Sequence, residues 1–171
     1  MTVEVRPGRP EDGEALRAIE RAAGERFRTV GLGWVADDEP TSVAALAAYA
    51  ADGRSWVAVD AAGTPVGYLI AEVVDGCAHV EQVSVAPSAQ GTGVGRALLD
   101  AVGGWAAAAG RPAVTLTTFA DVPWNRPLYE HLGFRVVAEE EIGPGLAAVR
   151  AAEAAHGLDP ATRACMRLDL A

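Results

Sequence analysis

The chain has 171 residues, half of them hydrophobic, and 23 acidic against 14 basic residues give it a formal net charge of −9. This length and composition suffice for one core, so we expect a single domain over residues 1–171. The negative charge argues against nucleic acid or an anionic membrane as a partner, and two cysteines and three histidines without metal-ligand spacing predict neither a disulfide framework nor a metal site.

The start of the sequence lacks the apolar core of a signal peptide, and no run of about 18 apolar residues occurs, so we expect a cytoplasmic protein. Residues 3–6 predict a strand. Pro10, followed by two acidic residues, predicts the start of a helix. Further elements expected in this half are a loop at 31–40, a helix at 42–51 and paired strands at 55–59 and 66–74.

Strands and helices alternate in the second half. A strand is predicted at 79–85 and a helix from about Val94, where apolar residues recur with a period of 3.6. The elements expected after them are a strand at 113–119, a helix after Pro123, a strand at 134–137, a helix at 146–156 and a strand at 164–170. This order predicts an α/β (α+β) fold with a mixed, partly parallel sheet covered by helices.

The run from Gln90 to Arg96 places three glycines between a strand and a helix. Backbone N–H groups in the first turn of a helix have no intrahelical partner, and the helix dipole is positive there. Gly91, Gly93 and Gly95 let phosphate oxygens approach the main chain, and Arg96 adds a charge-assisted contact. The run is therefore suited to binding a diphosphate.

The spacing excludes two common phosphate motifs. A dinucleotide fingerprint needs a further glycine where Arg96 or Leu98 stands, and a Walker-type loop needs a lysine, which the sequence lacks. What remains is Gln-x-x-Gly-x-Gly after the apolar strand that contains Val83 and Val85. This pattern resembles the acyl-CoA-binding motif of the GNAT superfamily of N-acyltransferases.

A second segment, residues 124–134, resembles the same superfamily. It is similar to the family's late helix, which carries an Asn and a Tyr, here Asn125 and Tyr129, and is closed by Gly133 and Phe134. Residues four apart share a helix face, and glycine suits the position after a helix end. Two motifs in the family's order outweigh the alternative explanation, a tight turn and a core tyrosine.

The resemblance implies a central sheet of about seven strands flanked by helices, and transfer of an acetyl group from acetyl-CoA to a primary amine by direct attack in a ternary complex. It also implies that the pantetheine amides pair with the backbone near Val83 and Val85, where a strand N–H polarises the thioester carbonyl. The implied coenzyme-binding residues are Val83, Val85, Gln90, Gly91, Thr92, Gly93, Val94, Gly95, Arg96 and Asn125.

Such a reaction needs an acid and a base. Tyr129 is the candidate acid, because a phenol pKa near ~10 is close enough to the ~8.5 of a thiol to protonate the leaving group. His79 and Glu81 are candidate bases, since alternation places them on one strand face with Val83 and Val85, and related enzymes use Glu or His at either position. We favour Glu81, which lies about 7 Å nearer to the thioester position along the strand.

The acceptor is less defined. Glu20, Phe27, Trp34 and Trp124 are placed around an acceptor pocket by analogy with the superfamily, although core packing would explain any one of them. A small-molecule amine is favoured over a protein, and an acidic chain suits a cationic substrate. We expect no nucleic-acid or membrane partner, and we leave a homodimer open.

Two alternatives to acetyl transfer remain. The donor is a longer acyl-CoA or an acyl carrier protein in the first, although the net charge of −9 disfavours an acidic carrier. The second is a non-catalytic CoA-binding sensor or assembly module. The presence of Tyr129, Glu81 and His79 argues against it, because binding alone requires none of them.

Overall fold

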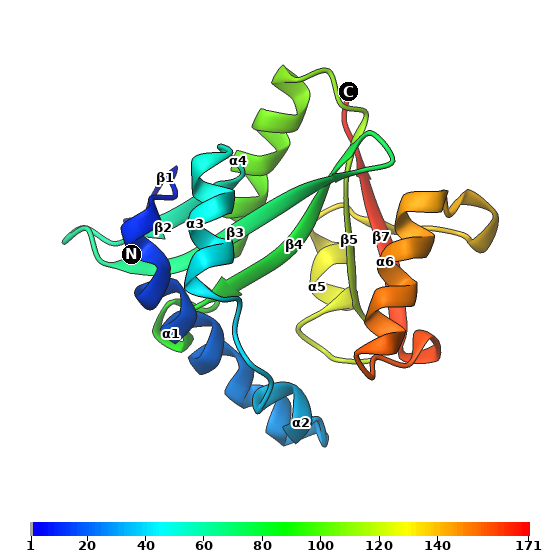
Figure 1. Ribbon diagram of the computed structural model, residues 1–171, viewed down its shortest axis with the longest axis horizontal. Helices are drawn as coiled ribbons and strands as arrows, with labels where there is room; N and C mark the ends of the chain where they lie inside the picture. The colour runs from blue at the N-terminus through cyan, green and yellow to red at the C-terminus, as the bar shows by residue number, and fades with distance from the viewer. Residues whose placement is uncertain (1) are drawn as a thin grey trace. The chain divides into compact units, whose positions relative to one another are not determined.

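The computed structural model describes residues 2–171, in which strands and helices alternate along the chain (Figure 1). The strands are β1 Glu4–Pro7, β2 Ser55–Val59, β3 Pro65–Val74, β4 Cys77–Val85, β5 Ala113–Phe119, β6 Arg135–Val136 and β7 Arg163–Asp169. The α-helices are α1 Gly13–Gly24, α2 Gly33–Ala36, α3 Val43–Ala51, α4 Val94–Ala108, α5 Arg126–His131 and α6 Pro144–Ala155. Short 3-10 helices are η1 Pro10–Asp12, η2 Glu25–Val30, η3 Pro87–Ala89, η4 Glu139–Glu141 and η5 Pro160–Thr162.

Within residues 2–171 the strands form one seven-stranded mixed sheet in the order β1-β2-β3-β4-β5-β7-β6. β4 and β5 pair in parallel, whereas β1 with β2, β2 with β3, β5 with β7 and β6 with β7 are antiparallel. The predicted fold class and the partly parallel sheet are therefore confirmed. The contacts divide the chain into two compact units, the first comprising residues up to Ala71 with Glu81–Val102, and the second Glu72–Val80 with Gly103–Ala171.

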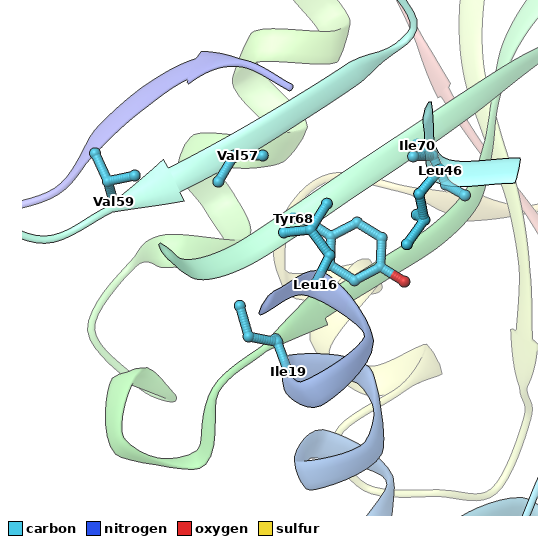
Figure 2. Packing of buried hydrophobic residues seen from close by; sticks show 7 residues of the cluster. All are labelled: Leu16, Ile19, Leu46, Val57, Val59, Tyr68 and Ile70. Carbon is cyan, nitrogen blue, oxygen red and sulfur yellow. The ribbon is translucent and has the colours of Figure 1, made fainter. Parts of the chain in front are cut away.

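The core of the first unit lies where α1 and α3 cover one face of β2 and β3. Alternate residues of the two strands point into it, because side chains in a strand alternate between faces. The buried cluster consists of Leu16 and Ile19 of α1, Leu46 of α3, Val57 and Val59 of β2, and Tyr68 and Ile70 of β3 (Figure 2). Gly67 faces the other way, and a Cβ there would lie 2.8 Å from Val94 Cγ1 at the start of α4. Helices thus cover both faces of this part of the sheet.

The second unit is built on β5, which pairs with the start of β4 and along its whole length with β7. The N-terminus of α6 is held by Asp75 in the turn between β3 and β4. Its carboxylate accepts the N–H groups of Gly145 and Leu146 at 2.8 and 3.0 Å. A carboxylate at this end of a helix satisfies donors that lack intrahelical partners and complements the helix dipole.

The element bounds agree with the sequence prediction at β5 and within a few residues elsewhere, with one exception. Residues 25–36, which include part of the predicted loop at 31–40, form η2 and α2. Gly31, with a φ of 76°, ends η2. Each of the two helical segments is too short to show the repeating apolar pattern from which a helix is predicted. α3 begins as expected, with the Ser42 hydroxyl accepting from the Ala45 N–H at 3.1 Å.

Candidate active site

The glycine loop, residues 90–96, leads from η3 into α4 in the first unit. Gly91 and Gly93 have φ values of 76° and 90°, a left-handed conformation that favours glycine, and a Cβ at either position would meet no atom within 4 Å. The first helical hydrogen bond runs from the Ala97 N–H to the Gly93 carbonyl at 3.0 Å. The N–H groups of residues 94–96 therefore precede the intrahelical ladder, and the loop offers them to an anion.

The first turn of α4 presents backbone rather than bulky side chains. Val94 is 1% exposed, and its side chain packs inward beside Gly67. Gly95 would place a Cβ 3.9 Å from Val85 Cγ2, so this turn adjoins the end of β4. Arg96 is exposed. An anion at this helix end would thus meet backbone donors with an exposed guanidinium beside them.

Side chains fasten the glycine loop to the strand and helix around it. Gln90 Nε2 donates to the Val85 carbonyl at 3.1 Å, and Arg26 Nη1 of η2 donates to Gln90 Oε1 at 3.3 Å. The Thr92 hydroxyl donates to the Ala89 carbonyl. The side chains of Gln90 and Thr92 therefore shape the loop. Arg26 was not predicted, because it lies 64 residues from Gln90 along the chain.

The end of β4 has an inverted pattern, with a buried polar residue between two partly exposed valines. Ser84 is 5% exposed and accepts a hydrogen bond from Gln82 Nε2 at 2.9 Å. Val83 and Val85 are only half-buried, and Glu81 is exposed. This stretch offers backbone and apolar surface to an extended ligand. The carboxylate of Glu81 lies two residues before Val83 on the same strand.

His79 lies in the second unit and is buried, with 2% exposure. It is paired in register with Thr115 of β5, and Nδ1 is 2.9 Å from the Thr115 hydroxyl. Burial lowers the pKa of His79, while the carboxylates of Glu153, Glu72 and Asp75 act in the opposite direction. The imidazole is thus held in its neutral form, which is the form that accepts a proton.

The Asn125–Tyr129 segment of the second unit forms α5, with Asn125 as the N-cap residue rather than within the helix. The Tyr129 N–H donates to the Asn125 carbonyl at 3.1 Å. The half-buried Tyr129 ring packs edge-on against Phe134 with centroids 5.8 Å apart. Trp124 precedes the helix and is half-buried. The relative position of Asn125 and Tyr129 is thus set by the first turn of α5, and the Tyr129 ring is held by its contact with Phe134.

The predicted acceptor residues of the first unit have different environments. Trp34 of α2 is 44% exposed, and Phe27 of η2 is half-buried. Glu20 of α1 accepts the backbone N–H and the hydroxyl of Thr41 at 2.9 and 3.0 Å, and the hydroxyl of Tyr68 at 2.7 Å. Tyr68 and Thr41 were not predicted, because Tyr68 lies in an apolar strand that resembles any core strand and Thr41 lies in a loop.

Comparison with known proteins identifies the family of the chain. A family model described as the Acetyltransferase (GNAT) family matches residues 16–134. The matched range includes the glycine loop and the Asn125–Tyr129 segment. The chain therefore belongs to the GNAT acetyltransferase family.

Solved structures share the fold. The PaiA N-acetyltransferase from Thermoplasma acidophilum, in complex with coenzyme A, matches with a TM-score of 0.72 and 16% identity over 99% of this chain and 100% of that chain. The ribosomal-protein-S18-alanine N-acetyltransferase from Escherichia coli matches with a TM-score of 0.65 and 19% identity over 99% and 95%. N-acetylglutamate synthase from Neisseria gonorrhoeae, complexed with coenzyme A and N-acetyl-glutamate, matches with a TM-score of 0.72 and 16% identity, and this chain spans 36% of its length.

The open space beside Gly91 and Gly93 in the first unit, which a side chain would fill, fits the diphosphate of coenzyme A. In the second unit, Asn125 Oδ1 is buried and accepts no hydrogen bond within residues 2–171. A buried acceptor without a donor costs roughly 1–3 kcal/mol.

Within residues 2–171, no group of three or more His, Cys, Asp and Glu side chains lies close enough together to hold a metal ion. No helix in that range is both long and apolar enough to span a bilayer.

Proposed function

We propose that the protein is an acyl-CoA-dependent N-acyltransferase that transfers an acetyl group from acetyl-CoA to a primary amine of a small molecule, by direct attack in a ternary complex. The observation that carries this proposal is the glycine loop, which offers backbone donors and open space at the N-terminus of α4 in a chain of the GNAT family. A negatively charged diphosphate is the part of acetyl-CoA that suits such a site.

The donor would be held by the glycine loop and the end of β4. The N–H groups of residues 94–96 and the exposed Arg96 would bind the diphosphate. The backbone at Val83 and Val85 would pair with the pantetheine amides, and Asn125 would accept a hydrogen bond at its buried Oδ1. Bound acetyl-CoA supplies a thioester carbonyl that an amine can attack.

Glu81 would act as the base. It would take a proton from the incoming amine, directly or through one water, so that the nitrogen lone pair can form the new C–N bond. Its exposure is consistent with this role, because solvent can reach the carboxylate. His79, which is buried and neutral, is the second candidate.

Tyr129 would act as the acid. As the C–S bond breaks, its hydroxyl would donate a proton to the departing sulfur, which leaves as the thiol. The N–H of Val85 would donate to the carbonyl oxygen as negative charge develops there. The first turn of α5 and Phe134 restrict the position of the Tyr129 ring, which lowers the entropy cost of aligning the acid.

The acceptor would be a small molecule that contacts Glu20, Phe27, Trp34 and Trp124. A carboxylate among aromatic side chains suits an amine with an apolar part. Neither a nucleic acid nor a membrane is proposed as a partner, and the protein would act in the cytoplasm, alone or as a homodimer.

A turnover screen tests this proposal. Purified protein is mixed with acetyl-CoA and a panel of primary amines, and free thiol is measured, with Gly93→Asp as the blank that lacks a donor site. Amine-dependent thiol release in the wild type alone is expected. Release only with longer acyl-CoA or with an acyl carrier protein would change the donor, and coenzyme A binding without turnover of any donor would favour the sensor.

A further inference from the structure

Glu20 is a half-buried carboxylate that is satisfied by neutral groups alone. Its oxygens accept the N–H and the hydroxyl of Thr41 and the hydroxyl of Tyr68, at 2.7 to 3.0 Å. Across residues 2–171, no arginine or histidine forms an ion pair with it. A carboxylate that is held only by neutral donors and forms no ion pair can be complemented by a cationic ligand.

The arginine of α1 that is spaced to share a helix face with Glu20 is directed elsewhere. Arg17 lies three residues before Glu20, a spacing at which helical side chains can form an ion pair. Its Nε instead donates to the Thr41 carbonyl at 3.1 Å, and its Nη2 donates to Glu39 at 3.2 Å. Arg17 is therefore engaged by Thr41 and Glu39 and forms no ion pair with Glu20.

Tyr68 holds Glu20 in a fixed orientation. Its side chain is fully buried in the core cluster (Figure 2). Burial, followed by the charge of Glu20, raises the pKa of Tyr68, so the hydroxyl stays protonated and donates.

We propose that Glu20, oriented by Tyr68 and Thr41, binds a second, non-reacting cationic group of the acceptor, so that the preferred substrates are diamines or other amines with a distant positive charge. This inference rests on the proposed function and defines its substrate class. The group bound by Glu20 cannot be the reacting one. An ion pair with a carboxylate keeps an amine protonated, and a protonated amine has no lone pair for attack.

Matched amines test the inference by binding and by turnover. The probes are n-butylamine and 1,4-diaminobutane, which differ in one terminal ammonium group. Their affinities for the protein loaded with coenzyme A are measured by calorimetry, and their KM and kcat with acetyl-CoA are measured by thiol release. Glu20→Gln keeps the shape of the side chain and one acceptor oxygen but removes the negative charge. Glu14→Gln, at an exposed position of the same helix, removes the same charge and serves as the control.

The wild type should bind 1,4-diaminobutane about tenfold or more tightly than n-butylamine, the scale of one well-placed charge pair. Glu20→Gln should lose most of that preference, through KM rather than kcat, and Glu14→Gln should retain it. Equal binding of the two amines in the wild type would overturn the inference, and so would an unchanged preference in Glu20→Gln with the fold intact by circular dichroism.

Failure of this inference and failure of the proposed function have different signatures. If acetyl-CoA is turned over with other amines while the two probes bind equally, only the role of Glu20 is wrong. If no amine is acetylated, the proposed function is wrong, and the calorimetric comparison still decides whether Glu20 selects a second positive charge.

Discussion

The two compact units of the molecule differ in the kind of group that each brings to its candidate site. The first unit presents charge and charge-binding groups: the N–H groups at the glycine loop, an exposed Arg96 and the carboxylate of Glu20. The second unit presents neutral groups that are able to move a proton, His79 and Tyr129, both restricted by packing. The comparison suggests that changes in the first unit should alter binding, whereas changes in the second should alter the chemical step.

Opposite signs of charge occur within the first unit itself. The glycine loop offers donors to an anion, and Glu20 offers acceptors to a cation. Such a pair of sites can distinguish an acyl donor that carries phosphates from an amine substrate that carries ammonium groups. The net charge of −9 conceals this arrangement, because it is a single sum over the whole sequence.

Gly93→Asp should have the largest effect. Its φ of 90° strains any side chain, and the new carboxylate would occupy the open space in which the diphosphate is expected. Coenzyme A binding, measured by calorimetry, should be abolished in a folded protein. Gly157→Asp is the matched control, with a φ of 98°, open space and the same added charge, and it should bind normally. Unchanged affinity in Gly93→Asp would remove the glycine loop from the donor site.

Tyr129→Phe should have the next largest effect, and it should affect the chemical step only. The ring and its contact with Phe134 are retained, but the proton is lost. We expect kcat to fall about 10²-fold, the usual scale of a positioned acid, with little change in coenzyme A affinity. Tyr49→Phe, in α3, removes a hydroxyl elsewhere and should leave kcat unchanged. Full activity in Tyr129→Phe would mean that water or substrate supplies the proton.

Glu81→Gln is the sharpest test of the division between the units, because Glu81 belongs to the first unit and is proposed to act in the chemical step. We expect kcat/KM to fall by about tenfold or more at neutral pH and to recover in part as pH rises and free amine becomes available. His79→Ala should have a smaller effect. A pH–rate profile that is unchanged in Glu81→Gln but flattened in His79→Ala would transfer the base role to the second unit.

The same difference explains what the sequence could predict. The glycine loop is contiguous, and its function depends on backbone, so its residues and spacing identify it directly. The family, the fold class and the bounds of β5 followed from similarly local patterns. The Glu20 network joins residues from three separate segments, and Tyr68 is 48 residues from Glu20 along the chain. No local pattern distinguishes this tyrosine from its apolar neighbours.

The burial of His79 could not be predicted from the sequence either. The alternation of side chains along β4 placed His79 on one face with Glu81, but whether that face is buried depends on the elements that cover the strand, which are set by tertiary structure. Its register with Thr115 depends on a parallel pairing between segments 36 residues apart. The roles of His79 and Glu81 therefore remain predictions that pH-dependent measurements decide.

The smallest expected effect concerns stability and follows from the burial of His79. Because burial lowers its folded pKa below the unfolded value of about 6.5, the unfolded chain binds the additional proton more readily. His79 therefore contributes stability that is present above that value and is lost as pH falls through and below it. The wild type should lose more thermal stability between about pH 7.5 and 5.5 than His79→Gln does, whatever the absolute stability of the variant. His131→Gln, at an exposed position, should retain the wild-type dependence on pH. Equal pH dependence in the wild type and His79→Gln would mean that His79 accepts its proton in place, and burial would then not hold the imidazole neutral.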